Sequence, residues 1–447
     1  GGVFGHLILT RASERRLGLP PELVGFLQVH PPYVGWRGTA HGPSYRKACI
    51  MLVVVAPGQG AQSPGFLAPW LELEGVRERL DWLSAVSGID LIAHGTTSDA
   101  DTIRDTAIAQ PLIVGAGLVT LLSLFPHPGS GFSQVAAGAG HSVGEITAAV
   151  GAGVLSAEQA MVFVRERGKA MAAAAAITPT GMSAVLGGEA DQVVAKAEQH
   201  GLTPANMNGA GQIVVAGTME QLAAFAADPP DGARVRPLEV AGAFHTSHMA
   251  PATGILGGYA RSISTHDPRL RFISNTDGQV VHDGRDVLRR LVTQVSNPVR
   301  WDLCMRTMGE LGVTAVIEIP PAGTLTGLIK RALPGVETLA VKTPDDLDSA
   351  WAMIAAHTTH TPIGSQPTWR LLIAPAKGTF VQTLTTPVGE SLAVGATVGT
   401  IDTLRDSTPI LAPHGGVVVE WLVHDGDPVS PGQPIVRLHP ESQESTG

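Results

Sequence analysis

Short apolar segments alternate with longer helical patterns between residues 51 and 345, and this alternation constrains the fold more than any other feature. Leu52-Val53-Val54-Val55 is a continuous apolar run, typical of a strand that is buried on both faces. Val135-Ala136-Ala137 and Ala315-Val316-Ile317 are similar short segments, whereas residues 157–175 follow a helical pattern. Strands that alternate with helices predict an α/β fold with a largely parallel sheet.

Two segments flank this pattern. Residues 1–50 are rich in Gly, Pro and Arg and show no sustained period of 2 or 3.6, so we expect a poorly ordered extension there. The stretch 357–367 is rich in Thr, His and Pro, which is typical of a linker. We therefore expect a first domain over 51–345 and a linker over 346–368.

An internal repeat follows the linker. Two series of Pro and Gly residues, 38 positions apart, share nearly the same intervals: 3, 11 and 6 residues in the first and 3, 10 and 6 in the second. The series are Pro375, Gly378, Gly389 and Gly395, and Pro413, Gly416, Gly426 and Gly432. Two such halves predict a pair of interlocked β-hairpin units that close one small all-β domain over 369–440, followed by a tail over 441–447.

The charge and the cysteines exclude several kinds of site. A formal net charge of −9 argues against a broad nucleic-acid surface, because phosphate contacts need clustered Lys and Arg. Only two cysteines occur, Cys49 and Cys304, and they lack the spacing of a disulfide framework or a metal site. We expect no nucleic-acid partner and no metal.

The longest apolar stretch runs from Leu112 to Phe125, between Pro111 and Pro126. It is shorter than the ~20 residues that cross a bilayer, so it predicts a buried helix. The sequence does not open with a basic segment, an apolar core and a small-residue cleavage site, which are the parts of a secretory signal. We expect a cytoplasmic protein without a membrane partner.

A candidate nucleophile follows the segment around Val135. Gly140-His141-Ser142-Val143-Gly144 precedes a helical run from Glu145 to Val150, so strand, sharp turn and helix occur in the order of a nucleophile elbow. The glycines permit the tight turn, and the helix start aims free N–H groups, notably that of Val143, at a developing oxyanion. In so Gly-rich a chain, the pattern alone also fits a tight turn with an incidental serine.

A serine nucleophile needs a base, and the sequence contains 16 histidines. The best candidate is His245, within Gly242-Ala243-Phe244-His245-Thr246-Ser247-His248-Met249. Its alternative role is that of a loop or capping histidine, which is the expected role for most of the sixteen.

Six segments together resemble the malonyl-CoA:acyl carrier protein transacylase family, particularly its actinobacterial form. The resemblance covers roughly residues 51–345. It implies an α/β-hydrolase-like large subdomain with a ferredoxin-like small subdomain inserted at about 177–240, and an active site in the cleft between them. The segments are Ala56-Pro57-Gly58-Gln59-Gly60-Ala61-Gln62, Gly140-His141-Ser142-Val143-Gly144-Glu145, Arg165-Glu166-Arg167-Gly168, Ala205-Asn206-Met207-Asn208-Gly209, Gly242-Ala243-Phe244-His245 and Gln294-Val295-Ser296-Asn297-Pro298-Val299.

The resemblance also implies a role for each matching residue. Ser142 would be the nucleophile and His245 its base. Gln59 and Val143 would supply the backbone N–H groups of the oxyanion hole. The carbonyl of Gln294 would orient His245, so that no carboxylate is needed as a third member.

Acyl selectivity is expected from two further residues. Arg167 lies 25 residues after Ser142, on the helix predicted over 157–175. A planar guanidinium can hold a carboxylate through two parallel bonds, and malonyl carries a free carboxylate. The family's matching arginine does this, although a solvated helix charge is the alternative role for Arg167. Phe244 resembles the family's bulky wall against an α-methyl branch, which favours malonyl over methylmalonyl.

The implied reaction transfers malonyl from malonyl-CoA to the phosphopantetheine thiol of an acyl carrier protein through malonyl-Ser142. It needs no metal, nucleotide or redox cofactor.

The family favours fatty-acid synthesis and a monomer, while a polyketide carrier stays open. Candidate contacts for an acidic carrier, each also readable as a solvated charge, are Arg234, Arg236, Lys330 and Arg331.

The repeat over 369–440 resembles the biotinyl or lipoyl attachment domain. In that family a lysine lies on the hairpin that joins the halves, a few residues before an Ala-Pro like Ala412-Pro413. Counting back from Ala412 places Arg405 at the lysine position, and the nearest lysine, Lys377, lies in the first half. A protonated guanidinium is a poor nucleophile, so we expect no biotin or lipoate. The domain would then serve in protein contact or be an inert appendage.

Two other functions stay open. An esterase or thioesterase would use the same Ser142 and His245 but pass the acyl group to water, and it gives no reason for Arg167 beside the acyl chain. A scaffold derived from an acyltransferase would instead act through its C-terminal β domain.

Overall fold

The structure of the protein is a computed structural model. The residues that it describes are 51–126, 128–357, 370–388, 390–403, 405–413 and 415–439. The predicted extension over 1–50, the predicted tail over 441–447 and the segment 358–369 lie outside the described residues.

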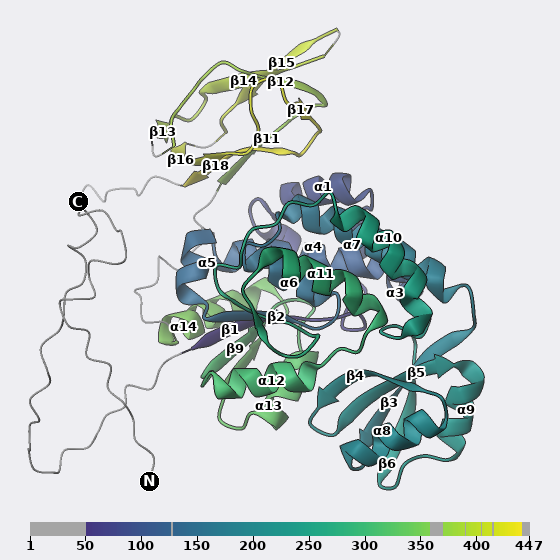
Figure 1. Cartoon of the computed structure of the whole chain (residues 1–447). Coiled ribbons are helices and arrows are strands. Elements are labelled where there is room, and N and C mark those ends of the chain that lie inside the picture. The colour runs from purple at the N-terminus through teal and green to yellow at the C-terminus, as the bar shows by residue number, and fades with distance from the viewer. Residues whose placement is uncertain are drawn as a thin grey trace, which may run out of the picture. The chain divides into compact units, whose positions relative to one another are not determined.

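A six-stranded sheet lies at the centre of the first domain (Figure 1). Its strand order is β10-β9-β1-β2-β7-β8, and all neighbours pair in parallel except the antiparallel pair β7 and β8. The strands are β1 (Leu52–Ala56), β2 (Ala137–Gly140), β7 (Arg271–Ile273), β8 (Val280–Val281), β9 (Ala315–Glu318) and β10 (Glu337–Ala340). Parallel neighbours need long crossover connections, and helices supply them here, as the alternation in the sequence predicted.

Strand β1 is buried along its whole length and separates two apolar cores. Leu52 and Val54 face the larger core, and Val53 and Val55 face the smaller one. This alternation follows from the two-residue period of a strand. The larger core includes residues of α1 (Val76–Ser87), α2 (Leu91–Thr96), α3 (Ala100–Arg104), α4 (Thr106–Leu124), α6 (Gly144–Gly151), α7 (Ala157–Ala175), α10 (Ala250–Ala260) and α11 (Gly284–Thr293), and the smaller core includes residues of α12 (Trp301–Glu310) and α13 (Thr324–Ala332).

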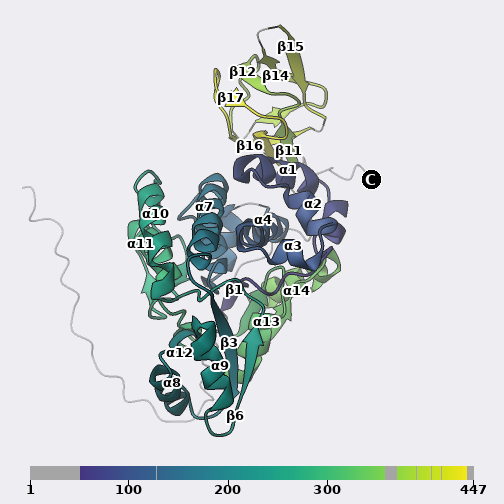
Figure 2. The same ribbon diagram turned by 90° about the vertical axis from the view of Figure 1, so that its right-hand side faces the viewer.

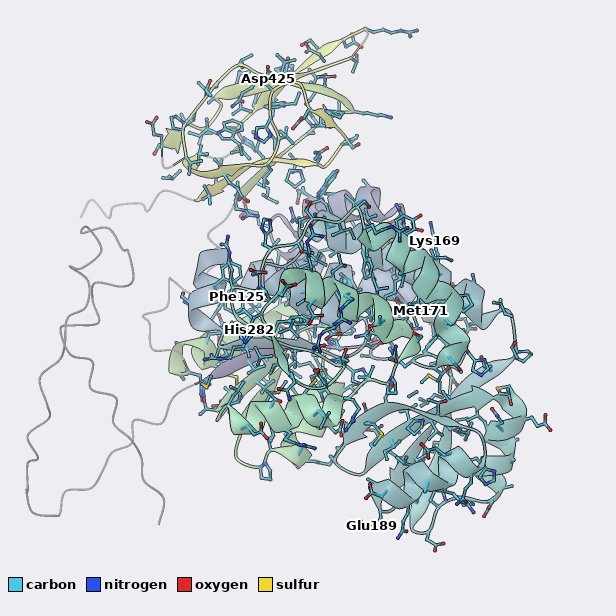
Figure 3. The ribbon with its side chains drawn as sticks, in the orientation of Figure 1. Phe125, Lys169, Met171, Glu189, His282 and Asp425 are labelled. Atoms are coloured by element: carbon cyan, nitrogen blue, oxygen red, sulfur yellow. The ribbon has the colours of Figure 1, made fainter. Side chains whose placement is uncertain are left out.

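Helix α7 has the bounds that its sequence pattern predicted. Its first turn is closed by a capping box, in which Ser156 Oγ accepts the N–H of Gln159 at 3.1 Å and the Gln159 side chain accepts the N–H of Ser156 at 2.9 Å. Figure 3 labels two residues of this helix, Lys169, which is exposed, and Met171, which is buried. The buried side of α7 also carries Arg167.

The longest apolar stretch forms most of α4, which begins before Pro111 and not after it. Asp105 caps the helix by accepting the N–H of Ala107 at 2.7 Å, which satisfies one of the free donors of the first turn. Helix α4 is long and apolar enough to cross a membrane, yet 78% of its apolar window is buried inside the protein. It is therefore a core helix of the first domain, as predicted.

A small subdomain is inserted after α7 and lies at the lower end of Figure 2. Its strands and helices follow one another as β3, α8, β4, β5, α9 and β6, and the antiparallel sheet has the order β4-β5-β3-β6. This is the ferredoxin-like arrangement that the family resemblance implied. The elements are β3 (Thr180–Gly187), α8 (Ala190–Gln199), β4 (Thr203–Gly209), β5 (Gln212–Thr218), α9 (Met219–Ala227) and β6 (Ala233–Leu238).

The first domain extends beyond residue 345, where we expected the linker to begin. Helix α14 (Leu347–Ala356) places Leu347, Ala350, Met353 and Ile354 in the larger core. These positions have the spacing of one helix face, a signal that the Thr-, His- and Pro-rich residues after the helix obscured.

The C-terminal domain consists of two four-stranded antiparallel sheets, of orders β11-β18-β16-β13 and β15-β14-β12-β17. Each sheet takes two strands from each half of the repeat, so the halves interlock as predicted. Gly395 and Gly432 have φ values of 77° and 79°, which only glycine adopts freely, so the repeat keeps glycine at both turns. The strands are β11 (Arg370–Ile373), β12 (Gly378–Gln382), β13 (Ser391–Leu392), β14 (Thr397–Asp402), β15 (Ser407–Leu411), β16 (Gly416–Trp421), β17 (Pro428–Val429) and β18 (Pro434–His439).

Candidate active site

The predicted nucleophile elbow joins β2 to α6, with Ser142 in the turn. Ser142 has a φ of 52°, a strained value for a residue with a side chain that is typical of functional turns. Both flanking glycines are required by close backbone contacts. A Cβ atom on Gly140 would lie 2.1 Å from the backbone of Gly144, and one on Gly144 would lie 2.3 Å from the carbonyl oxygen of Ala56. The glycine pattern therefore reflects a turn that no larger residue could form.

His245 lies beside the elbow serine. Its Nε2 is 2.7 Å from Ser142 Oγ, and its Nδ1 is 2.8 Å from the backbone carbonyl oxygen of Gln294. A carbonyl can only accept, so Nδ1 carries the proton and Nε2 is free to accept the hydroxyl proton of the serine. Burial, with a further contribution from the charge of Arg167, lowers the pKa of His245 to about 3, so the ring is neutral at physiological pH.

Arg167 brings a buried positive charge to the same serine. Its Nη2 lies 3.3 Å from Ser142 Oγ and 2.8 Å from Gln294 Oε1, and its Nη1 lies 2.6 Å from Gln110 Oε1. Burial lowers the pKa of Arg167 to about 10, which still leaves it protonated near pH 7. Within the described residues its Nε has no hydrogen-bond partner. The guanidinium is therefore a cation with an unused donor next to the nucleophile.

The two predicted oxyanion donors are Val143, which directly follows Ser142, and Gln59. Val143 is the N-cap residue of α6, so its N–H has no partner within the helix. Gln59 is in the loop after β1, where the neighbouring Gly58 packs so closely that a Cβ atom would lie 2.9 Å from the carbonyl oxygen of His141. The side chain of Gln59 donates from Nε2 to the carbonyl oxygen of Arg104 at 3.3 Å.

Of the other predicted residues, Phe244 is buried and the candidate carrier contacts are exposed. Phe244 is buried in the larger core, directly before His245 in the chain. The candidate carrier contacts are all exposed and lie on β6 or at the end of α13: Arg234, Arg236, Lys330 and Arg331.

Three polar residues at the site had no role in the sequence analysis. Gln110, on α4, accepts from Arg167, and Asn275, just after β7, accepts the N–H of Ser142 on its Oδ1 at 2.9 Å. Glu145 hydrogen bonds to Asn275 and Gln294. Only Glu145 lay inside a quoted motif. Asn275 follows the carboxyl end of a strand in the same sheet as β2, which is where ligand sites of parallel sheets form, and this position was the available signal.

The residues present also limit which cofactors the chain can hold. Among the described residues, no group of three or more His, Cys, Asp or Glu side chains is placed to bind a metal ion. In the β domain, the hairpin between β14 and β15 is closed by Thr403, whose N–H donates to the carbonyl oxygen of Asp406 at 2.8 Å. Arg405 is exposed on this hairpin. A hairpin that presents a guanidinium does not fit covalent attachment of biotin or lipoate, which needs a lysine amine.

Two family models match this chain. One described as an acyl transferase domain matches residues 53–351, and one described as a biotin-requiring enzyme matches residues 371–438. The chain is 48% identical over 303 residues to the malonyl CoA-acyl carrier protein transacylase of Mycobacterium tuberculosis, which covers 67% of this chain and 98% of that protein. It is 33% identical over 305 residues to the transacylase of the same name from Bacillus subtilis, with 66% and 94% covered.

Solved structures of transacylases also match this chain. The crystal structure of MCAT from Mycobacterium tuberculosis matches with a TM-score of 0.65 and 48% identity, over 67% of this chain and 99% of that chain. A malonyl-transacylase solved in complex with a type II PKS acyl-carrier protein matches with a TM-score of 0.61 and 28% identity, over 69% and 99% of the two chains.

Proposed function

This chain belongs to the acyltransferase family that contains the malonyl-CoA:acyl carrier protein transacylases, and we propose that it moves malonyl from CoA to an acyl carrier protein. One observation carries this proposal: Ser142 Oγ lies 2.7 Å from a neutral histidine nitrogen and 3.3 Å from a buried guanidinium. The histidine can activate the serine, and the guanidinium can hold the carboxylate of a malonyl group that reacts there.

The first half-reaction forms malonyl-Ser142. Ser142 Oγ attacks the thioester carbon of malonyl-CoA while His245 Nε2 takes the hydroxyl proton. The backbone N–H groups of Gln59 and Val143 hold the resulting oxyanion. The carbon–sulfur bond then breaks, the CoA thiolate takes the proton from His245, and the acyl enzyme remains.

The second half-reaction reverses these steps with a different thiol. The phosphopantetheine thiol of the carrier gives its proton to His245 and attacks malonyl-Ser142. The ester bond breaks, Ser142 regains a proton from His245, and malonyl leaves as a thioester on the carrier. Thioester is exchanged for thioester, so the sequence needs no metal, nucleotide or redox step.

Arg167 supports malonyl over uncharged acyl groups. Its two Nη groups are held by the neutral oxygens of Gln110 and Gln294, so the charge is oriented without being neutralised by a paired carboxylate. Phe244, buried beside His245, is proposed as the wall against an α-methyl branch. A thioesterase using the same Ser142 and His245 is the second candidate, and it gives no role to this buried cation.

The carrier can belong to fatty-acid or polyketide synthesis. The Mycobacterium and Bacillus relatives are named as acyl carrier protein transacylases, and a structural neighbour was solved with a polyketide carrier. We propose a cytoplasmic monomer without a membrane or nucleic-acid partner. The burial of α4 and the net charge of −9 support the absence of these two partners, and the family resemblance supports the monomer.

We also propose that the β domain carries no prosthetic group. The support for this is Arg405, which occupies the hairpin where the attachment family has its lysine, together with Lys377, the one lysine of residues 370–439, which lies before β12. The domain would then act in protein contact or be inert.

The test of the transfer reaction uses intact mass. Wild-type protein treated with malonyl-CoA should gain one malonyl group, and a pantetheinylated carrier should then remove it. Ser142→Ala should keep the fold and form no adduct, because a small hydroxyl in an elbow contributes little packing. An adduct on this variant would remove Ser142 from its role, and release of free malonate in place of malonyl-carrier would favour the thioesterase.

A further inference from the structure

Glu145 connects the residues around the nucleophile. It lies three residues after Ser142, on α6, with 1% of its surface exposed. Its Oε1 accepts the backbone N–H of Asn275 at 2.7 Å, and its Oε2 accepts a hydrogen bond from Gln294 Nε2. Both partners also contact the serine backbone: Asn275 Oδ1 accepts the N–H of Ser142 at 2.9 Å, and Gln294 Nε2 donates to its carbonyl oxygen at 3.1 Å.

We propose that Glu145 is a positioning residue for the malonyl carboxylate site, where its carboxylate holds the amide of Gln294 so that Oε1 points at Arg167. This inference rests on the proposed malonyl transfer and adds a residue to it. An ionised carboxylate can only accept hydrogen bonds, so Gln294 must turn its NH₂ group toward Glu145. Its carbonyl oxygen then faces Arg167 Nη2 at 2.8 Å.

The opposite orientation of the Gln294 amide would disrupt this arrangement. It would place an NH₂ group against a guanidinium that can only donate, and an oxygen against a carboxylate that can only accept. Arg167 would keep Gln110 as its acceptor but lose Gln294. Because a guanidinium holds a carboxylate in a fixed fork geometry, the loss of one anchor should affect malonyl more than an uncharged acyl group.

The charge of Glu145 is sensitive to pH in the neutral range. Burial raises the pKa of Glu145 to about 7, although its hydrogen bonds and Arg167 act in the opposite direction. Arg167 stays protonated and His245 stays neutral in that range. Burial lowers the pKa of Arg167 only to about 10, lowers the pKa of both His141 and His245, and raises the pKa of the Cys304 thiol.

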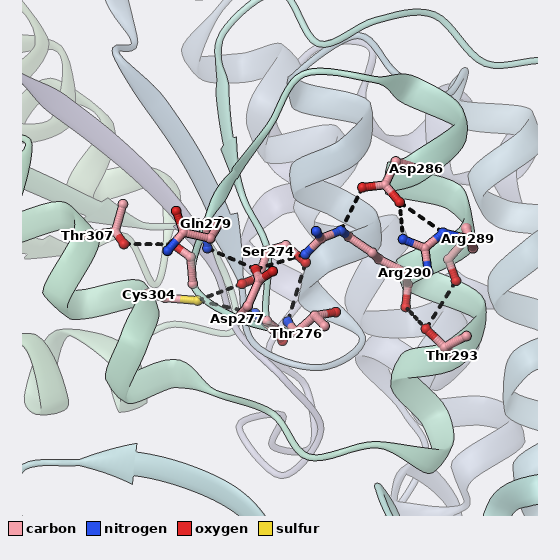
Figure 4. A network of polar contacts seen from close by, with 12 residues as sticks. Ser274, Thr276, Asp277, Gln279, Asp286, Arg289, Arg290, Thr293, Cys304 and Thr307 are labelled. Atoms are coloured by element: carbon pink, nitrogen blue, oxygen red, sulfur yellow. Dashed lines mark hydrogen bonds and ion pairs between the residues drawn. The ribbon is translucent and has the colours of Figure 1, made fainter.

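The elements packed against α6 add charged groups that are either exposed or already bonded. Lys169 on α7 and Arg285 on α11 are exposed, and Glu158 on α7 accepts from Trp82 Nε1 at 3.1 Å. The segments β1, β2 and α4 contain no ionisable residue. On α7, Arg165 pairs with Glu166, and on α11, Arg289 and Arg290 pair with Asp286. Figure 4 shows these α11 pairs and the hydrogen bond from Cys304 Sγ to the carbonyl oxygen of Ser274, at 3.3 Å.

Protonation of Glu145 should therefore weaken malonyl selectivity. A protonated carboxyl has an O–H donor. When that O–H is directed at Gln294 and not at Ser274, Gln294 can accept it only by turning its carbonyl oxygen away from Arg167. The carboxylate form, which holds the productive orientation, is present above the pKa and is lost as the pH falls through about 7. The preference for malonyl over acetyl should decrease in that direction.

The test compares Glu145→Gln with Glu318→Gln. Glu318 is also fully buried, but it accepts the N–H groups of Leu325 and Thr326 at the start of α13, so its variant controls for the loss of a buried carboxylate. The kcat/KM values for malonyl-CoA and acetyl-CoA are measured from pH 6 to pH 8. At pH 8 we expect the malonyl-to-acetyl ratio of Glu145→Gln to fall about tenfold, the effect of losing one buried hydrogen-bond partner.

The pH profile adds a second readout. The malonyl-to-acetyl ratio of kcat/KM should fall from pH 8 to pH 6 in the wild type and in Glu318→Gln. In Glu145→Gln this ratio should stay constant. A Glu145→Gln ratio equal to that of the wild type would overturn the inference. If that variant does not fold, a wild-type ratio that is constant from pH 6 to pH 8 overturns it. A wild-type enzyme that transfers no malonyl to the carrier would instead refute the proposed function.

Discussion

Arg167 differs from an ordinary buried arginine in its partners. Buried charges in proteins are normally paired with an opposite charge, because an unpaired one is costly to remove from water. The described hydrogen bonds of Arg167 go to two amide oxygens and a hydroxyl, and none goes to a carboxylate. Glu145 acts on this charge from nearby but makes no hydrogen bond with Arg167 in the described part of the chain, so the guanidinium can still form a direct pair with a carboxylate on the substrate.

Replacing this residue should change selectivity more than general activity. For Arg167→Ala we expect about a hundredfold loss in kcat/KM with malonyl-CoA and a much smaller loss with acetyl-CoA, because charge-assisted hydrogen bonds to the substrate carboxylate disappear. Arg165→Ala, two residues earlier on α7 and paired with Glu166 at 2.6 Å, is the matched control and should leave the ratio unchanged. Equal losses for both acyl groups would assign Arg167 a structural role.

Among the elements, α7 and β2 show what local sequence could and could not predict. The bounds of α7 were predicted from the helical pattern over 157–175, and the structure adds the capping box of Ser156 and Gln159 that starts the helix. Strand β2 was expected around Val135 but runs from Ala137 to Gly140, with the sequence Ala-Gly-Ala-Gly. Such small residues have little intrinsic β propensity, and they form a strand here because β1 and β7 pair with them on both sides.

The site residues likewise divide into those that a local motif contains and those that only the tertiary fold brings together. Ser142, His245 and Arg167 each lie in a short motif that could be recognised locally. Gln110 and Asn275 lie in no such motif, and each acquires its role only when α4 and the end of β7 meet the elbow. Short motifs thus supplied the candidate reacting groups, and the tertiary fold was needed to find the residues that contact them.

Helix α14 provides a prediction at the scale of an element. A chain that ends at residue 357 should fold and transfer malonyl, because it keeps every core residue of the first domain. A chain that ends at residue 345 removes four buried apolar residues and should be unfolded or strongly destabilised. Three of them, Leu347, Met353 and Ile354, have side chains of a size that contributes about 2–5 kcal/mol each in a core. Thermal unfolding monitored by circular dichroism distinguishes the two chains. Equal stabilities would mean that α14 does not belong to the core.

At the scale of the whole molecule, the chain joins an acyltransferase domain to a domain of the biotinyl and lipoyl type. The second domain keeps its own apolar core, which includes Phe380, Val398 and Ile435, and it keeps glycine at the matching turns Gly395 and Gly432. Its fold is therefore maintained by packing that does not depend on a prosthetic group. What it lacks is a nucleophilic amine at the hairpin between β14 and β15.

Placing an amine at that hairpin tests the proposal that the domain carries no prosthetic group. We expect wild-type protein coexpressed with biotin and lipoate ligases to show no mass increase, because the guanidinium of Arg405 stays protonated and is a poor nucleophile. Arg405→Lys should gain one biotinyl or lipoyl group by intact mass, because a lysine ammonium gives up its proton more readily than a guanidinium. The hairpin backbone should keep its shape, because it is closed by hydrogen bonds of Thr403 that the substitution does not touch. Lys377 is present in both proteins and controls for modification elsewhere. A modified wild type would refute the expected absence, whereas an unmodified Arg405→Lys variant would mean that the hairpin has lost its ligase contacts as well as its lysine.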